Sequence, residues 1–238
     1  MPSTIATRRI HGLHATGLSS RKPTSGPEND LVLEYIADFL PKAPRGQQRQ
    51  IFLEPAIESG FPDVVAVYSS VVATRKWSAQ RVLLQPIDIR IAHFLAMRGD
   101  TATGDLGLFF GNRGNESAQR LCSAGLILRT AMGWRLRSLR EVFAVRRLIA
   151  IEAKIADWKG GLVQAFQNTW FASESYLLLP KLPKRVAAIE EMRRFGVGLI
   201  TRGMSLDSSA VSARQDNLPK SYASWLFNEW AWQMTETI

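Results

Sequence analysis

Short apolar runs and amphipathic segments alternate through the second half of the chain, and this alternation constrains the fold more than any other feature. The apolar runs at residues 148–155, 176–179 and 196–201 are typical of strands. Apolar residues at helical spacing mark the two segments between them, 162–171 and 184–195. Strands that alternate with helices imply an α/β layer with some parallel pairing, so the sequence predicts this class.

The first part of the chain predicts a helix followed by a hairpin. Apolar side chains recur at helical spacing from residue 29 onward. Residues 50–57 and 61–68 are typical of strands, and a Ser-Gly pair between them has turn chemistry. Together these two strands suggest a hairpin. A Trp-rich helix over residues 221–234 would close the core.

The charge balance favours a polyanionic partner. Thirty Lys and Arg residues against 21 Asp and Glu residues give a formal charge of +9 and a pI near 10.1. We expect no membrane partner, because no apolar run approaches the roughly 20 residues that a spanning helix needs. The basic N-terminus lacks the apolar region of a secretory signal, so a cytoplasmic location is expected. The single cysteine, Cys122, argues against a thiolate metal site, so oxygen ligands would hold any metal.

Three charged residues suggest a metal-dependent site. Successive side chains of a strand point to opposite faces, so Glu152 and Lys154 share one face of the strand at 148–155. Asp63 stands near the beginning of the strand at 61–68. Mg²⁺ prefers oxygen ligands and usually takes one or two carboxylates, completing its shell with water and substrate phosphate. Asp63 and Glu152 on neighbouring strands would fit such an ion, with Lys154 beside it.

The segments Phe61-Pro62-Asp63-Val64-Val65 and Ile151-Glu152-Ala153-Lys154 resemble the signature of the PD-(D/E)XK, or restriction-endonuclease-like, nucleases. The resemblance implies an α/β core built on a mixed sheet flanked by helices. It also implies that Asp63 and Glu152 are ligands of Mg²⁺, for which Mn²⁺ can substitute. It further implies that Ala153 offers its backbone carbonyl to the metal and that Lys154 positions or activates the attacking water. By the same resemblance, a helical acid and a helical glutamine of the family correspond to Glu34 and Gln164.

The helix motif of the family is kept only in part. The family commonly has a tyrosine four positions after the helical glutamine, whereas this chain has Asn168 four positions after Gln164. Glu54 and Glu58, on or near the strand before Asp63, compete with Glu34 for the role of the extra acid.

The residues between the two motifs, 85–138, have elements of their own. Three helix-like segments are followed by two strand-like runs at 126–130 and 134–137. This order resembles a winged helix-turn-helix. An insertion of this kind explains why Asp63 and Glu152 are 152 − 63 = 89 residues apart, far more than the hairpin connection that usually separates such strands.

Basic and amide side chains gather on the inserted segment and predict contacts to DNA, although solvated surface positions are the alternative. Arginine can read guanine edges and Asn or Gln can read adenine edges. The candidates on and before the third helix are Arg113, Asn115, Gln119 and Arg120. The candidates on the strand-like runs, where phosphate contact is natural, are Arg129, Arg135 and Arg137.

The chain is thus predicted to comprise a flexible basic arm at 1–28, a first core part at 29–84, a winged-helix insertion at 85–138 and a second core part at 139–238. We expect a Mg²⁺-dependent endonuclease that acts on double-stranded DNA, as a homodimer if both strands are cut. Restriction, antiviral defence and repair all suit such an enzyme, alone or within a larger complex. The alternatives are a non-catalytic DNA-binding or assembly subunit with a nuclease-like scaffold, and an RNA-directed enzyme.

Overall fold

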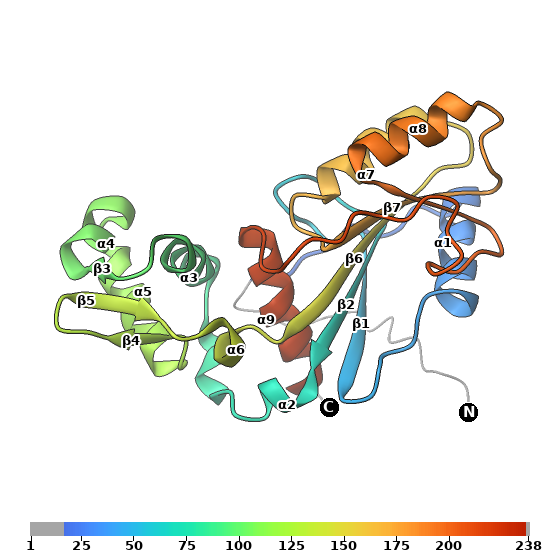
Figure 1. The fold of residues 1–238 in the computed structure, drawn as a ribbon. Coiled ribbons are helices and arrows are strands. Elements are labelled where there is room, and N and C mark those ends of the chain that lie inside the picture. The colour runs from blue at the N-terminus through green and yellow to red at the C-terminus, as the bar shows by residue number, and fades with distance from the viewer. Residues whose placement is uncertain (1–16, 237–238) are drawn as a thin grey trace.

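A five-stranded mixed sheet forms the centre of the larger part of the molecule in the computed structural model, which describes residues 17–236 (Figure 1). The strands lie in the order β1-β2-β6-β7-β8. Their bounds are Gln47–Leu53 (β1), Val64–Ser70 (β2), Val145–Ala153 (β6), Glu174–Leu179 (β7) and Gly198–Thr201 (β8). The β1–β2 and β2–β6 pairs are antiparallel, whereas the β6–β7 and β7–β8 pairs are parallel. The predicted α/β class with partly parallel pairing is confirmed.

Helices cover both faces of this sheet because its central strands are apolar on both sides. On β6, Ile149 and Ile151 pack with α1, whereas Leu148 and Ala150 face the opposite side. The helix on the first face is α1 (Pro27–Asp38). The helices on the opposite face are α7 (Trp158–Asn168), α8 (Val186–Phe195) and α9 (Tyr222–Glu236). The face that carries α7 is therefore also the face on which Glu152 lies.

A smaller, mainly helical part stands beside the sheet (Figure 1). Its elements are α3 (Pro86–Arg98), β3 (Thr101–Ala102), α4 (Thr103–Phe110), α5 (Arg113–Ser123), β4 (Ile127–Arg129) and β5 (Gly133–Leu136). The three strands form an antiparallel sheet in the order β3-β5-β4. All these elements lie in sequence between β2 and β6, which are hydrogen-bonded neighbours. The long separation of the two sequence motifs is thus spanned by a folded unit.

The two parts are joined by three short helical segments and by α9. The short segments are α2 (Val71–Thr74), the 3-10 helix η1 (Ala79–Leu83) and α6 (Leu139–Val142). Helix α9 contacts α3 of the helical part as well as β2 and β6 of the sheet. Its aromatic side chains explain this position, because Phe227 contacts both Phe52 of β1 and Phe171 after α7, at ring-centroid distances of 5.5 Å.

The chain before α1 differs from the flexible arm predicted for residues 1–28. Residues 1–16 lie outside the described residues, but the segment that follows them is ordered against the end of β1. The backbone N–H of Arg21 donates to the carbonyl of Glu54 at 3.0 Å, and that of Ala56 donates to the carbonyl of Ser19 at 2.8 Å. Helix α1 then begins at Pro27, because proline favours the first turn of a helix. The structure thus gives this segment backbone hydrogen bonds to the chain that follows β1.

Several element boundaries also differ from the predicted ones. Strand β1 ends at Leu53, because Glu54 has a left-handed backbone conformation with φ of 43°. Strand β6 ends at Ala153, so Lys154 lies just beyond the strand. Strand β3 was not predicted, since two residues are too short to show a period. Among residues 17–236, no helix is long and apolar enough to cross a membrane.

Candidate active site

Asp63 and Glu152 face each other across two neighbouring strands. Val64, the first residue of β2, pairs with Ile151 of β6, so Asp63 lies opposite Glu152 at the next position of the antiparallel ladder. Asp63 Oδ2 accepts a hydrogen bond of 2.8 Å from the backbone N–H of Ala153. This bond holds the carboxyl group of Asp63 at the end of β6, where it meets the side chain of Glu152.

Glu152 is a buried carboxylate with only one satisfied oxygen. The residue is 3% exposed. Its Oε1 accepts a hydrogen bond of 2.7 Å from Nδ2 of Asn168, at the end of α7. Its Oε2 has no donor among the described residues, and the carboxyl group of Asp63 lies within hydrogen-bonding reach of Glu152. A buried acceptor without a donor is costly, so this oxygen requires either a proton or a cation.

Burial and mutual repulsion make this carboxyl pair hard to ionise. Burial, followed by the charge of Asp63, raises the pKa of Glu152 from its ordinary value of 4.5 to about 8. Burial also raises the pKa of Asp63, although the hydrogen bond from Ala153 and the charge of Lys154 oppose this shift. Two adjacent carboxyl groups of this kind share a proton near neutral pH. A cation could replace that proton and stabilise both negative charges.

Lys154 provides a positive charge beside the pair. Its Nζ lies 3.9 Å from Oε2 of Glu28, in the first turn of α1, and its side chain is 17% exposed. The stem of the lysine lies against α7, since a Cβ atom on Gly161 would come within 2.7 Å of the Lys154 Cγ. The positive charge of Lys154 lowers the pKa of both Asp63 and Glu152, against the larger upward effect of burial.

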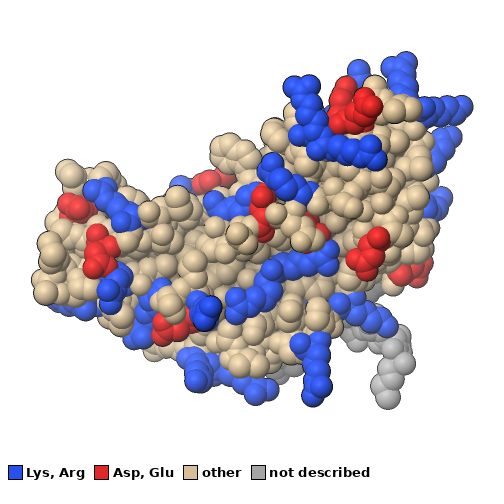
Figure 2. All heavy atoms as spheres, viewed as in Figure 1, with Lys and Arg blue, Asp and Glu red and all other residues tan. Residues whose placement is uncertain are grey.

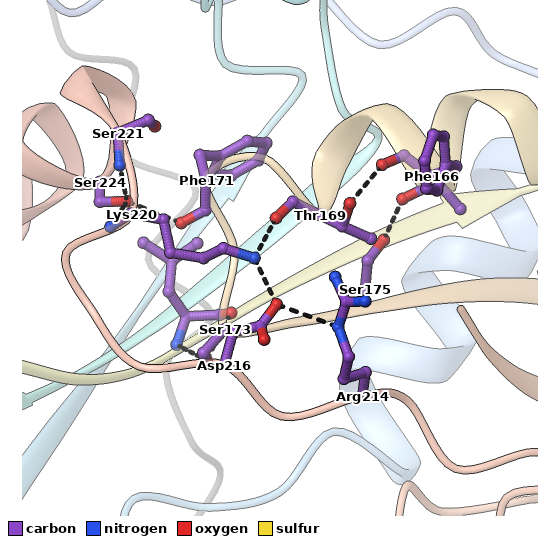
Figure 3. A network of polar contacts seen from close by, with 12 residues as sticks. Phe166, Thr169, Phe171, Ser173, Ser175, Arg214, Asp216, Lys220, Ser221 and Ser224 are labelled. Carbon is purple, nitrogen blue, oxygen red and sulfur yellow. Dashed lines mark hydrogen bonds and ion pairs between the residues drawn. The ribbon is translucent and has the colours of Figure 1, made fainter. Parts of the chain in front are cut away.

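A polar network behind the site fixes the end of the helix that carries Asn168 (Figure 3). The ammonium group of Lys220 donates to the carbonyl of Thr169, the residue that follows Asn168. Ser224 Oγ donates to the carbonyl of Phe171 at 2.8 Å. These bonds satisfy carbonyl groups at and just beyond the C-terminus of α7, which would otherwise lack partners. The amide of Asn168 is therefore presented to Glu152 from an anchored helix end.

Two predicted site residues have other surroundings. Glu34 forms an ion pair with Arg202, with 3.0 Å between Oε2 and Nε. Glu28 is instead the acid of α1 whose charge acts on Asp63. Gln164 is exposed on α7, and Asn168, one turn later, makes the amide contact with the carboxyl pair. The structure thus gives Glu34 and Gln164 no contact with Asp63 or Glu152.

The two acids near β1, Glu54 and Glu58, differ in their burial and in their distance from the carboxyl pair. The carboxylate of Glu54 is buried, and its charge raises the pKa of Asp63. Glu58 is exposed and pairs with Arg90 on α3. Of these two alternatives for the extra acid, Glu54 is the one that lies near the pair.

The oxygen donors of the pair suit a hard divalent cation. No three His, Cys, Asp or Glu side chains within residues 17–236 converge as a ready-made metal cage. Mg²⁺ often takes only one or two protein carboxylates and completes its shell with water and substrate oxygens. The donor-free Oε2 of Glu152 beside the carboxyl group of Asp63 fits this requirement. The site lacks the sulfur and nitrogen donors that zinc prefers.

The predicted DNA contacts on α5 fall into two groups. Arg113, Asn115 and Gln119 are exposed. Arg120 is bound by the fully buried carboxylate of Asp88, with 2.8 Å from Nη2 to Oδ1 and 3.0 Å from Nε to Oδ2. The guanidinium of Arg120 therefore braces α5 against α3, and the base contacts predicted for this helix are left to the three exposed residues.

The arginines of the small sheet also differ in their freedom. Nε of Arg135 lies 3.7 Å from Oδ1 of Asp100, and Nη1 of Arg137 lies 3.5 Å from Oε1 of Glu141. Both pairs are surface pairs and hold their partners weakly. Arg129 is exposed, with its guanidinium carbon 5.6 Å from the centre of the Trp134 ring. Arg129 and Arg135 are exposed to a phosphate, whereas Arg137 is half-buried and its Nε is enclosed.

No family model, no curated protein and no solved structure matches this chain. The arrangement of Asp63, Glu152 and Lys154 is therefore the observation from which a function can be inferred.

Proposed function

We propose that the protein is a Mg²⁺-dependent endonuclease that hydrolyses phosphodiester bonds in double-stranded DNA. The observation that carries this proposal is the meeting of half-buried Asp63 with buried Glu152, one of whose oxygens has no donor within residues 17–236, while the charge of Lys154 acts on both carboxyl groups. Concentrated negative charge next to a cationic side chain is what metal-assisted hydrolysis of a phosphodiester requires.

Each residue of the site has a definite task in this reaction. Asp63 and Glu152 would hold the Mg²⁺ ion, and Ala153 keeps the Asp63 carboxyl group in place through its N–H. When bound, the ion supplies Lewis acidity that stabilises charge developing on the phosphate oxygens. Lys154 donates hydrogen bonds to the attacking water or to a phosphate oxygen. Asn168 holds Oε1 of Glu152 in one orientation and leaves Oε2 for the ion.

The order of elements supports a restriction-endonuclease-like core. Helix α1 is followed by the β1–β2 hairpin, then by β6, α7 and β7, which is the order inferred from the two sequence motifs. Asp63 stands at the start of the second strand and Glu152 near the end of the third strand of this core. We infer that the helical part is a winged helix, in which α5 is the recognition helix and β4–β5 is the wing.

Exposed cations on both parts support a nucleic-acid substrate. Figure 2 shows Lys and Arg side chains over the helical part and over the part that contains the large sheet. The net charge of +9 adds attraction for phosphate that is independent of sequence. We infer that α5 and the wing bind the duplex while the carboxyl pair cleaves it.

Cleavage of plasmid and short duplex DNA with Mg²⁺ or Mn²⁺ tests this proposal. We expect cleavage that EDTA abolishes and that Lys154→Ala reduces by at least about a hundredfold, the usual range for a group that assists proton transfer. Lys159→Ala is the matched control, because Lys159 is an exposed lysine of α7. Cleavage that persists both in EDTA and in the Lys154→Ala protein would rule out the proposed mechanism.

The second candidate is a DNA-binding or assembly subunit in which the core is only a scaffold. The raised pKa of Glu152 favours this alternative, because a proton shared with Asp63 stabilises the pair at neutral pH without any metal. Calorimetric titration with Mg²⁺ separates the two candidates. Binding of Mg²⁺ that is lost in Asp63→Asn supports the enzyme, whereas tight duplex binding without Mg²⁺ binding supports the scaffold.

A further inference from the structure

A strained turn after β1 directs a carboxylate into the rim of the candidate site. Glu54 has φ of 43°, a conformation that side chains other than glycine rarely adopt. Its backbone N–H donates to the carbonyl of Asp63 at 3.1 Å, so the turn is fastened directly to the residue that carries the site. The side chain of Glu54 is only 10% exposed. Strain of this kind is often found where the chain must position a functional group.

Glu54 orients a guanidinium group at the edge of the site. Nε of Arg21 donates to Oε2 of Glu54, and the backbone N–H of Arg21 donates to the carbonyl of the same residue. The guanidinium carbon lies 5.2 Å from the centre of the Phe61 ring, two residues before Asp63. The Arg21 side chain is nevertheless 56% exposed. Within residues 17–236, its terminal nitrogens have no hydrogen-bond acceptor, so two donor groups face outward from a fixed plane.

The charges around the pair create a need for such a cation. A phosphodiester that reaches Asp63 and Glu152 also meets the negative charges of Glu28 and Glu54, which act on Asp63. The ammonium group of Lys154 lies beside Glu28. Without a further cation at the rim, the acids would repel the nucleic-acid backbone. An arginine with free terminal nitrogens matches the geometry of two phosphate oxygens.

We propose that Arg21 binds a phosphate group of the nucleic-acid backbone next to the phosphodiester held at Asp63 and Glu152. Glu54 and Phe61 act as positioning residues that hold the guanidinium plane from one edge and one face. The inference deepens the proposed function, since it assigns the substrate contact of the same site. It also gives the chain before α1 a role in binding, because this segment brings Arg21 to Glu54.

Affinity for a labelled DNA duplex, measured by fluorescence anisotropy in Ca²⁺ over a series of salt concentrations, tests the proposal. We expect Arg21→Ala to weaken binding about tenfold, the effect of one charge-assisted hydrogen bond. The slope of log Kd against log salt should fall by about one, because one phosphate contact is lost. Arg21→Lys should retain the salt slope but bind more weakly than the native protein. Lys22→Ala is the matched control, since it removes an exposed charge from the next residue and should leave the slope unchanged.

Three outcomes would overturn the proposal. Arg21→Ala could leave the salt slope at its native value, or Lys22→Ala could reproduce the whole loss. The double variant Arg21→Ala, Glu54→Gln removes the unpaired buried charge that the single variant creates, so recovery of native affinity in it would also contradict phosphate binding. These readings do not depend on cleavage. Absence of cleavage by the native protein would refute the proposed nuclease, whereas cleavage with unchanged Arg21→Ala binding would refute only the role of Arg21.

Discussion

Asn168 donates a hydrogen bond of 2.7 Å to Oε1 of Glu152, so the two oxygens of this carboxyl group have different surroundings. One oxygen is held by α7, while the other has no donor within residues 17–236, and the carboxyl group as a whole is in reach of Asp63. The pair consequently responds to whatever positive species reaches it, a proton or a divalent cation. Its stability and its affinity for metal should both depend on pH.

The stability of the metal-free protein should fall as the pH rises from about 5 to above 8. The folded state keeps its proton because the pKa of Glu152 is raised from 4.5 to about 8, so this contribution is present below 4.5 and is lost as the pH rises toward 8. Glu152→Gln should flatten the dependence of Tm on pH in EDTA. Glu34→Gln, which alters a half-buried acid of α1 that pairs with Arg202, is the control. A Tm that rises through this window would contradict the shared proton.

Binding of Mg²⁺ should displace the shared proton. Because ligands must be deprotonated to hold a metal, the affinity for Mg²⁺ should increase with pH up to about 8 and then level off. Calorimetry in two buffers of different ionisation enthalpy measures the number of protons released. We expect release of close to one proton per ion near pH 7 and almost none in Glu152→Gln. Equal proton release in both proteins would mean that the ion binds elsewhere.

Asn168→Ala should weaken Mg²⁺ binding and cleavage. The substitution removes the hydrogen bond to Oε1 of a buried carboxylate, which costs about 1–3 kcal/mol and pushes the pKa of Glu152 still higher. At pH 7 the metal then competes with a more tightly bound proton. Gln164→Ala is the matched control, because Gln164 is an exposed amide one turn earlier on α7. If both variants behave alike in calorimetry and cleavage, the Asn168–Glu152 bond has no functional role.

The sequence predicted the strands of the site better than the contacts of its side chains. A two-residue period and the apolar residues around Glu152 indicate a strand, and the insertion explains how Asp63 reaches it. The partner Asn168 comes from a helix that returns across the sheet, so no local pattern could reveal it. It nevertheless occupied the position at which the helix motif departed from the family pattern. The asparagine at a position where the family commonly has a tyrosine was the one signal in the sequence that pointed to a contact with Glu152.

The remaining differences have similar physical causes. Helix α1 was predicted from residue 29, where the helical spacing of apolar residues starts. It begins at Pro27, because proline suits the first turn, and this brings Glu28 onto the helix. Glu34 was chosen for its place on that helix, whereas the path of the chain after β8 supplies Arg202 as its partner. Arg120 was treated as a surface residue because Asp88, 32 positions away, is not visible as a partner in the local sequence.

Arg113 and Arg120 should respond differently to substitution. Arg113→Ala should weaken duplex binding and lower its salt dependence. The free energy of unfolding should change by no more than about 0.5 kcal/mol, because the side chain is exposed. Arg120→Ala should lower the free energy of unfolding by about 3 kcal/mol, since it removes the cation that faces the fully buried Asp88. Urea unfolding and anisotropy measure the two effects separately. A stable Arg120→Ala protein that binds DNA weakly would show that Arg120 contacts DNA and does not mainly stabilise the fold.

The buried ion pair between Arg81 and Glu229 should fasten the helical part to the sheet. Both side chains are almost fully buried, with 3.0 Å between Nε and Oε2, and Arg81 also donates to the carbonyl of Val142 at 3.0 Å. Arg81 belongs to the chain that enters the helical part, Val142 to the chain that leaves it and Glu229 to α9. Removing one partner leaves a buried charge, so Arg81→Met should cost about 3–5 kcal/mol in urea unfolding. Arg81→Met combined with Glu229→Gln should cost less than Arg81→Met alone, because the unpaired charge is gone.

The same double variant should loosen the link between the DNA-reading part and the carboxyl pair, so it should reduce cleavage of a duplex more than it reduces Mg²⁺ binding. Equal losses in both measurements would indicate general unfolding instead of a lost connection.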